Sequence, residues 1–309
     1  MDLQSLITHC VSKMDTDPEA QEARRLFHGR GHYYPGLEHL VVNWYPPYLL
    51  IASFAPLEQA FIEGLVEGFV SAAEGSDIKL LGIGLQIRAG RRTETTLLWG
   101  DLPDEHVVAE QGLHYLITPQ RNQNVGLFMD MAHVRAYMAQ YMPGARVLNL
   151  FAYTCAFSVS AIEHGAATVV NNDMSGNALK IGERNHELNG HDLRQVRMLP
   201  HNLFKSWWKI RQFGPYDLII IDPPTNQRGS FVAEKSYGQV LKRIPELARP
   251  GAQIMACLNS PFLGPDFLTA QMQRWCPAAQ LVQFLPQHPD FPDKYPERAL
   301  KVAHFSYPG

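Results

Sequence analysis

The sequence has no long apolar run. Its densest apolar stretch lies near residues 147–159 and is interrupted by Asn149, Thr154 and Ser158. It therefore falls short of the roughly 18 consecutive apolar residues that indicate a membrane-spanning helix. The first residues include Asp2 and lack a basic segment followed by an apolar one, so a secretion signal is not expected. These two absences lead us to expect a cytoplasmic protein.

Cysteine is scarce, and no two cysteines form a CxxC pair. The 309 residues contain four cysteines, which are Cys10, Cys155, Cys257 and Cys276. Their wide scatter is typical of reduced thiols and argues against a metal site or a disulfide framework.

An excess of charge of either sign is also missing. The 27 Lys and Arg residues nearly balance the 30 Asp and Glu residues, which gives a net charge of −3. This balance argues against a protein that coats nucleic acid by bulk electrostatics, but it leaves a local basic patch open. Two stretches are candidates, either as RNA contacts or as solvated loops: Arg24, Arg25, His28, Arg30 and His32, and Arg88, Arg91 and Arg92.

The first third of the chain predicts a small α+β domain over residues 1–118. Apolar spacing in Pro56–Ala73 indicates an amphipathic helix, and residues 1–25 also have a helical pattern. Leu37–Phe54 predicts two strands broken at Pro46-Pro47. Further predicted strands are Lys79–Arg88, Thr93–Trp99 and Leu113–Thr118, with a hairpin turn at Gly90-Arg91-Arg92.

From about residue 119 to residue 309, predicted strands alternate with helices. The strands are Arg146–Phe151, Thr168–Asn172, Gln195–Leu199, Leu218–Ile221, Ala252–Leu258, Gln280–Leu285 and Ala299–Phe305. The helices are Met129–Gln140, Phe157–Glu163, Ser175–Asn189, Lys205–Gln212, Tyr237–Leu247 and Asp266–Arg274. This alternation predicts an α/β domain with a doubly wound, mostly parallel, seven-stranded Rossmann-like sheet. Ligands of such sheets bind outside the carboxyl ends of the strands.

Two of the predicted strand-to-helix loops suggest a nucleoside site. The first, from Asn149 to Ser158, lacks the glycines that usually let a backbone approach a ligand, so the residues alone favour an ordinary buried turn there. In the second, Asp173 ends a strand at a distance typical of a carboxylate that accepts both ribose hydroxyls. Ser175 is the better placed helix cap, which leaves Asp173 for a ligand.

Two further loops follow the next predicted strands. Asn202 either accepts a hydrogen bond from an adenine amino group or simply makes a turn. The apolar strand Ile219–Ile221 runs directly into Asp222-Pro223-Pro224, where the prolines fix the backbone and aim neighbouring carbonyls. A rigid carbonyl and carboxylate at a strand end suit a planar base edge, although a merely stiff edge loop fits the pattern too. We expect Asp173 and Asp222 at neighbouring strand tips, facing one cleft.

The four loops, in this order, resemble those of class I S-adenosylmethionine-dependent methyltransferases. The likeness is to the family of large-subunit ribosomal RNA cytosine-C5 and guanine-N7 methyltransferases. It rests on RLFHGRGHYYPGLEHL (25–40), RNQNVGLFMDM (121–131), LNLFAYTCAFSVSA (148–161), NNDMS (171–175), IIIDPPTNQRGSF (219–231) and PERALK (296–301).

The resemblance implies S-adenosyl-L-methionine as the methyl donor and assigns the site residues. The donor-binding set is Gln123, Phe128, Asp130, Phe151, Ala152, Tyr153, Thr154, Asp173, Met174, Ser175, Asn202 and Leu203. Within it, Phe151–Thr154 would hold the methionine part, Asp173 the ribose, and Asn202 with Leu203 the adenine. Gln123–Asp130 would close over the donor. The implied catalytic set is Asp222, Pro223, Pro224 and Asn259.

The sequence also departs from the family pattern. Cys155 stands where glycine is usual, and a positive φ there would cost about 1–2 kcal/mol. Asn202 replaces an aspartate, and Asn226 replaces a frequent aromatic residue, which weakens base stacking at that point. The short leader is not expected to hold the PUA domain that is common in relatives.

The identity of the methylated atom depends on cysteine. Cytosine C5 becomes nucleophilic only after a thiolate adds at C6. Cys257 lies at the end of a predicted strand, whereas the family's nucleophile follows about two positions later, where this chain has Asn259. We therefore favour a ring or exocyclic nitrogen as the target and expect Cys257 to be a core residue.

Three functions remain open from the sequence. The first is methylation of a base in ribosomal or other structured RNA, with the N-terminal domain helping to bind RNA through Arg24–His32. The second is methylation of a protein or small molecule, and the third is a non-catalytic donor-binding scaffold. Oligomeric state is also open, with a homodimer as one option.

Overall fold

The computed structural model describes residues 1–17, 22–89, 93–121, 123–224, 226–227 and 231–309. The chain forms two compact units, each with its own core. The first unit comprises Met1–Ala132 and His288–Tyr295, and the second comprises His133–Gln287 and Pro296–Gly309. The division therefore falls after Ala132 rather than after Thr118, and a late segment joins the first unit.

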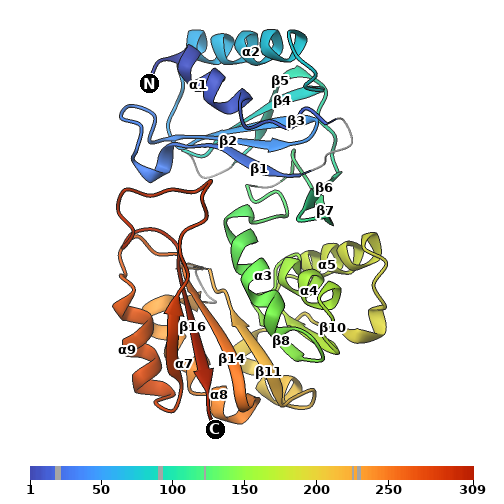
Figure 1. Ribbon diagram of the computed structural model, residues 1–309, viewed down its shortest axis with the longest axis vertical. Helices are drawn as coiled ribbons and strands as arrows, with labels where there is room; N and C mark the ends of the chain where they lie inside the picture. Colours follow the sequence, from blue (N-terminus) through green and yellow to red (C-terminus); the bar gives the residue numbers. More distant parts are fainter. Residues whose placement is uncertain (18–21, 90–92, 122, 225, 228–230) are drawn as a thin grey trace. The chain divides into compact units, whose positions relative to one another are not determined.

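A five-stranded sheet forms the first unit, in the order β1-β2-β3-β4-β5. Its strands are β1 (Arg24–His28), β2 (Leu40–Tyr45), β3 (Tyr48–Ser53), β4 (Gly82–Ile87) and β5 (Thr95–Gly100). Helices α1 (Leu3–Val11) and α2 (Gln59–Glu74) pack together above this sheet (Figure 1). A separate hairpin pairs β6 (His106–Glu110) with β7 (Leu113–Ile117), and short 3-10 turns are η1 (Gly29–Gly31) and η2 (Met129–Met131).

The sequence predicted most of this unit correctly. The two strands expected on either side of Pro46-Pro47 are β2 and β3, which pair antiparallel as a hairpin. Of the described residues in the range 1–25, only Leu3–Val11 is helical, and Arg24 begins the strand β1. The strand β6 was not predicted. The predicted turn at Gly90-Arg91-Arg92 lies outside the described residues, although β4 and β5 pair antiparallel on either side of it.

The second unit contains the predicted seven-stranded sheet, in the order β10-β9-β8-β11-β14-β16-β15. Its strands are β8 (Arg146–Leu150), β9 (Thr168–Asn172), β10 (Val196–Leu199), β11 (Tyr216–Ile221), β14 (Ala248–Leu258), β15 (Gln280–Phe284) and β16 (Lys301–Tyr307). The first five run parallel, and β16 is antiparallel to both of its neighbours. A small ribbon pairs β12 (Asn226–Gln227) with β13 (Phe231–Val232).

Helices cover both faces of this sheet. They are α3 (Ala132–Met138), α4 (Ala156–Glu163), α5 (Gly176–Leu188), α6 (Trp207–Arg211), α7 (Ala233–Leu241), α8 (Ile244–Leu247) and α9 (Asp266–Trp275). The chain winds outward from β8 through β9 to β10, and then from β11 to β14 in the opposite direction. Because the crossovers are right-handed, α4 and α5 cover one face while α7 covers the other (Figure 1). The fold is thus the doubly wound α/β sheet that the sequence predicted.

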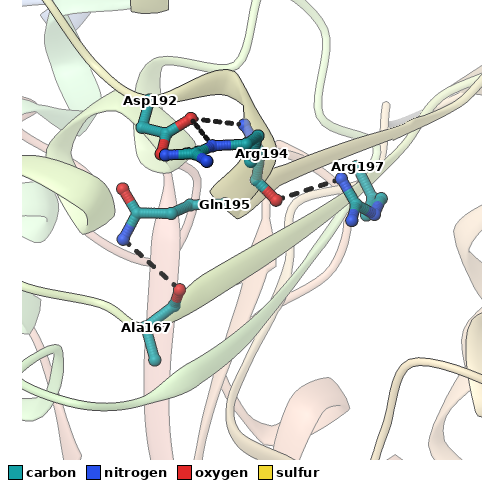
Figure 2. A network of polar contacts seen from close by, with 5 residues as sticks. All are labelled: Ala167, Asp192, Arg194, Gln195 and Arg197. Carbon is teal, nitrogen blue, oxygen red and sulfur yellow. Dashed lines mark hydrogen bonds and ion pairs between the residues drawn. The ribbon is translucent and has the colours of Figure 1, made fainter.

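Charged side chains protect the outer strand β10. Figure 2 shows how Asp192 accepts from the backbone and side chain of Arg194 in the turn η4 (Leu193–Gln195), while Arg197 donates to the Arg194 carbonyl at 3.1 Å. Gln195 Nε2 ties this turn to the Ala167 carbonyl at 3.5 Å. Arginines on an edge strand discourage pairing with another chain. None of the described helices combines the length and hydropathy of a membrane span.

Candidate functional site

The strand register brings three predicted loops to one edge of the second unit's sheet. Leu150 of β8 is paired with Asn172 of β9 on one side and with Ile221 of β11 on the other. The next residues along these strands are Phe151, Asp173 and Asp222, which therefore lie abreast at the carboxyl edge. The strand order reverses between β8 and β11, which is where ligands of doubly wound sheets bind.

The expectation of neighbouring tips for Asp173 and Asp222 needs a correction. The two residues share an edge, but β8 lies between their strands. Two strand spacings separate their backbones by about 10 Å. The interval contains the loop that follows β8, so this loop and not a direct pair of carboxylates is the centre of the site.

The loop after β8 has a backbone conformation with positive φ angles, which its glycine-free sequence does not predict. Phe151, Tyr153 and Cys155 have positive φ values of 61°, 48° and 64°, with no glycine among them. The backbone N–H groups of this loop tie it to β9, because Ala152 donates to the Asn172 carbonyl at 3.1 Å and Tyr153 donates to Asp173 Oδ2 at 2.9 Å. The expected cost at Cys155 is therefore present, because its φ lies in the left-handed region. The positive φ values of Phe151 and Tyr153 were not predicted.

Gly182 of α5 makes room for Cys155. A Cβ atom added at Gly182 would lie 2.4 Å from Cys155 Sγ, so only a residue without a side chain fits there. Cys155 is fully buried, and burial raises the pKa of its thiol well above the usual range. The thiol is thus a packing group between the loop and α5, and the glycine appears on the helix instead of in the loop.

Asp173 is half-buried at the tip of β9, and its two oxygens accept from different segments. Oδ2 accepts from the Tyr153 backbone N–H at 2.9 Å, and Oδ1 accepts from the Ser175 N–H at 2.8 Å. A carboxylate offers about four acceptor positions, so two remain for a ligand. Ser175 caps α5 as predicted, because its Oγ accepts from the Ala178 N–H at 3.1 Å. Met174 between them is exposed.

Asn202 serves as a cap at the tip of β10. Its Oδ1 accepts from the Phe204 N–H at 3.0 Å and so begins the short turn η5 (Leu203–Lys205). Leu203 is buried in the core of the unit. The turn-making alternative for Asn202 is therefore present in the structure, and a contact with adenine stays a prediction that would use the oxygen's remaining lone pair.

The Asp222-Pro223-Pro224 segment leaves the sheet beside Tyr237 of α7. Pro223 is buried, while Asp222 and Pro224 are half-buried. The buried Tyr237 hydroxyl donates to the Cys257 carbonyl at 3.0 Å. Burial raises the pKa of Tyr237 far above its usual value, and the nearby Cys257 and Asp222 add to this effect. Tyr237 therefore stays protonated and fixes the end of β14 beside Asp222.

Cys257 and Asn259 differ in exposure. Cys257 lies within β14, opposite Val302 of β16, and is fully buried, as expected for a core residue. Asn259 follows the end of β14 and is exposed. Gln123, Phe128 and Asp130 belong to the first unit, so their assignment to the donor site stays a prediction.

A chain of buried hydrogen bonds, from Asn149 to Glu163, lies beneath the loop and was not predicted from the sequence; we call it the polar chain. Asn149 Nδ2 donates to Asn171 Oδ1, and Asn171 Nδ2 donates to Ser158 Oγ, each at 2.9 Å. The Ser158 hydroxyl contacts His186 Nε2 at 2.9 Å, and His186 Nδ1 contacts His191 Nδ1 at 2.9 Å. His191 Nε2 ends the chain at Glu163 Oε2, 3.3 Å away. The signal was present as asparagines within apolar strands.

The direction of this chain follows from its first donors. Ser158 Oγ accepts from Asn171, so its own proton is directed to His186 Nε2. His186 then carries its proton on Nδ1, and His191 carries its proton on Nε2, toward the carboxylate. Burial, with His191 adding to it, lowers the pKa of His186 to about 3, which agrees with a neutral ring. The chain ties β8 and β9 to α4 and α5 directly below the two loops.

A second contact holds the loop from the side. Asn185 of α5 is fully buried, and its Nδ2 donates to the Thr154 carbonyl at 2.9 Å. Asn172 Nδ2 similarly joins the Leu199 and His201 carbonyls at 3.0 and 3.1 Å. No group of metal-binding side chains occurs among the described residues.

The sequence of this chain matches a known protein family over most of its length. The sequence model of a family described as S-adenosylmethionine-dependent methyltransferase matches residues 24–306. The chain belongs to this family. Its membership agrees with the doubly wound sheet and with a site at the carboxyl edge.

Proteins similar to this chain include several that are named for ribosomal RNA methylation. Ribosomal RNA large subunit methyltransferase I of Aeromonas hydrophila is 37% identical over 46% of this chain and 36% of its own length. The protein of the same name from Pseudoalteromonas atlantica is 28% identical over 70% of this chain and 57% of its own length. The matched region thus spans about a third to just over half of these relatives.

Solved structures of methyltransferases share the fold. SMU.776, which was solved with SAH, superposes with a TM-score of 0.83 at 22% identity, covering 98% of this chain and 80% of its own. Trm5b from Pyrococcus abyssi gives 0.62 at 15% identity, over 84% of this chain and 72% of its own. At these identities the likeness establishes the fold alone.

Proposed function

We propose that this member of the methyltransferase family transfers a methyl group from S-adenosylmethionine to a base of structured RNA, with ribosomal RNA as the first substrate to test. The observation that carries the proposal is Asp173, which keeps acceptor capacity at the carboxyl edge beside the positive-φ loop. Relatives named for ribosomal RNA methylation support the choice of substrate.

The residues at this edge fit the donor. The two free acceptor positions of Asp173 match the two hydroxyls of a ribose. Phe151–Thr154 would hold the methionine part, because this loop follows β8 at the carboxyl edge, between the strands that carry Asp173 and Asp222. Asn202 and Leu203 would border the adenine from the tip of β10. When bound, the donor supplies an already activated methyl group on sulfur, so the protein's task is chiefly to position the acceptor.

The acceptor side favours a nitrogen over cytosine C5. Methylation at C5 requires a thiolate that can reach the base. Cys257 is fully buried, and the described residues at the end of β14 offer Asn259 instead. Asp222-Pro223-Pro224 would present a carboxylate and fixed carbonyls to an amino group or a ring N–H. We therefore infer a ring or exocyclic nitrogen as the methylated atom.

The test is transfer of an isotopically labelled methyl group from S-adenosylmethionine to ribosomal RNA taken from cells that lack this protein. Nucleoside mass spectrometry then identifies the product. We expect one labelled base with its methyl on nitrogen. Label on cytosine C5 would contradict the nitrogen assignment. Absence of label in RNA, with donor binding intact, would contradict the RNA substrate and favour the protein or small-molecule alternative that the acidic net charge suggests.

A further inference from the structure

Three arginines of the first unit gather around two phenylalanine rings. Arg30 Cζ lies 3.9 Å from the centroid of the Phe54 ring, and Arg88 Cζ lies 5.6 Å from the same centroid. Arg25 Cζ lies 4.3 Å from the centroid of Phe291. Burial first, and the charges of Arg88 and Arg30 to a smaller extent, lower the pKa of Arg25 to about 10, so the guanidinium groups repel one another.

Neutral groups hold two of these arginines in place. Arg25 Nε donates to Asn43 Oδ1 at 2.6 Å, and its Nη1 donates to His28 Nδ1 at 2.7 Å. Burial first, and Arg25 second, lower the pKa of His28 to about 3, so this ring is an uncharged acceptor. Arg88 is held by the buried Gln86, whose Oε1 accepts from Nε at 3.1 Å and from Nη2 at 2.6 Å.

The positive charge of this cluster is not neutralised by direct pairing. Among the described residues, no carboxylate forms an ion pair with Arg25, Arg30 or Arg88. Burial lowers the pKa of Arg25 and of Arg30, and the charges of Asp130 and Asp293 oppose this effect without cancelling it. Half-buried guanidinium groups are usually paired with carboxylates, because desolvating a charge is costly. Three cations and two acids leave an excess of one positive charge, which attracts an anion.

The geometry suits a phosphate group in particular. Arg30 is exposed, and its side chain donates no hydrogen bond to any described residue. Arg88 donates through Nε and Nη2, so its Nη1 can donate to a ligand. Guanidinium groups bind phosphate oxygens with two parallel hydrogen bonds. Exposed aromatic side chains lie nearby, since Tyr295 packs edge-on against His32 and Tyr33 follows it. A basic surface next to exposed aromatic rings is typical of proteins that bind single-stranded nucleic acid.

We propose that Arg25, Arg30 and Arg88 form a phosphate-binding site of the first unit for the backbone of a single-stranded RNA segment. The site rests on the proposed function, which supplies RNA as the substrate. Of the basic residues that the sequence offered as RNA contacts, the proposal keeps these three. Of the second stretch, Arg91 and Arg92 lie outside the described residues.

The experiment measures binding of a fluorescent single-stranded RNA, about 12 nucleotides long, by anisotropy over a range of salt concentrations. The variants are Arg30→Gln and Arg30→Gln/Arg88→Gln in the full chain. Arg24→Gln is the matched control, because Arg24 is the neighbouring arginine of β1 and lies 3.6 Å from Asp290. Each protein is also titrated calorimetrically with S-adenosylmethionine.

We expect the negative slope of log affinity against log salt to become about 0.7 less steep for each phosphate-contacting arginine that is replaced. The affinity of the double variant should fall severalfold, while Arg24→Gln changes neither quantity and donor binding is the same throughout. Arg30→Gln alone keeps the test valid if the double variant fails to fold, because Arg30 is exposed.

Three results would overturn the site. An unchanged slope in Arg30→Gln and in the double variant would remove it while leaving the proposed function in place, provided that wild-type protein still methylates RNA. Inorganic phosphate that binds the wild type but does not compete with RNA would indicate a site for free phosphate. If the wild type binds donor but no RNA, both this site and the RNA substrate are wrong.

Discussion

At Asp173, each carboxylate oxygen already accepts one backbone hydrogen bond, so the side chain shapes the loop as well as the ligand site. Replacing it with asparagine removes the charge and one acceptor oxygen but keeps the size. Hydrogen bonds to a charged group contribute about 1.5–3 kcal/mol each. We expect Asp173→Asn to weaken S-adenosylmethionine binding by roughly ten- to a hundredfold, measured by calorimetry.

The control for this prediction is Asp217→Asn, at the opposite end of β11. Asp217 accepts from the Arg146 N–H at 2.8 Å and pairs with Arg249, so it has a comparable structural role far from the carboxyl edge. An equal loss of donor affinity in both variants would mean that Asp173 acts through general stability alone.

At Cys155, the left-handed backbone should reverse the usual order of stability between alanine and glycine. Alanine is normally more stabilising than glycine, but at φ 64° an alanine keeps the strain of about 1 kcal/mol that glycine relieves. Both substitutions lose the buried thiol equally. We therefore expect Cys155→Gly to have the larger free energy of unfolding, measured with urea. In α5, Ala178→Gly should show the ordinary order, and a glycine variant at 155 less stable than alanine would contradict this account.

The roles of some single residues could be predicted from the sequence, and those of others could not. The roles of Ser175 as a cap and Cys257 as a core residue were predicted, because both follow from local sequence. The positive φ values of Phe151 and Tyr153 were not, because the glycine that would signal such a turn lies instead at Gly182, across the helix interface.

Between the elements, the buried chain from Asn149 to Glu163 connects two strands to two helices. Ser158 stands in its middle, accepting from Asn171 and donating to His186. Removing its hydroxyl leaves two buried polar atoms without a partner, at about 1–3 kcal/mol each. We expect Ser158→Ala to lower the free energy of unfolding by at least about 2 kcal/mol, and to weaken donor binding.

Ser160 provides a matched control for this prediction. It is equally buried in α4, and among the described residues its hydroxyl has no hydrogen-bond partner. Ser160→Ala should therefore be nearly neutral in urea unfolding. Similar losses in both variants would show that the polar chain contributes little.

The same chain makes stability depend on pH. His186 has a pKa of about 3 in the folded protein, against a usual 6.5, because burial disfavours its charged form. Unfolding therefore takes up a proton between these values. The free energy of unfolding should fall by up to about 1.4 kcal/mol per pH unit below 6.5, and this group has no effect above it.

His186→Gln tests this dependence in urea titrations at pH 5 and pH 7. We expect the variant to have a shallower pH dependence, although His28 in the first unit retains a contribution of the same sign. The exposed His164 offers the comparison His164→Gln, which should keep the full dependence. A slope that is identical in wild type and His186→Gln would contradict a neutral buried ring.

Most strands of the two sheets could be predicted from the sequence, and the exceptions have physical reasons. Apolar runs such as Leu218–Ile221 identify buried parallel strands, and capping residues identify the helices between them. The strand β1 was missed because its five residues include two arginines and a histidine. The polar chain was missed because hydrogen bonds between residues far apart in sequence leave no periodic pattern.

Across the whole molecule, the two units differ in what the sequence revealed. The fold of the second unit was predicted, since the order of its loops follows from right-handed crossovers, while the donor site on it stays a prediction. The division of the chain was harder to predict. Segment 288–295 packs with the first unit, where the Lys294 N–H donates to the Gly31 carbonyl at 2.8 Å. A contact between residues so distant in sequence has no local signal.

The central claim is that the donor binds at the carboxyl edge of the second sheet, between the tips of β9 and β11. Amide hydrogen exchange, with and without saturating S-adenosylmethionine, tests this location directly. We expect slower exchange at the amides of Phe151–Thr154 and at those following Asp173 and Asn202. Donor binding that leaves these amides unchanged, or protects only segments elsewhere, would contradict the account.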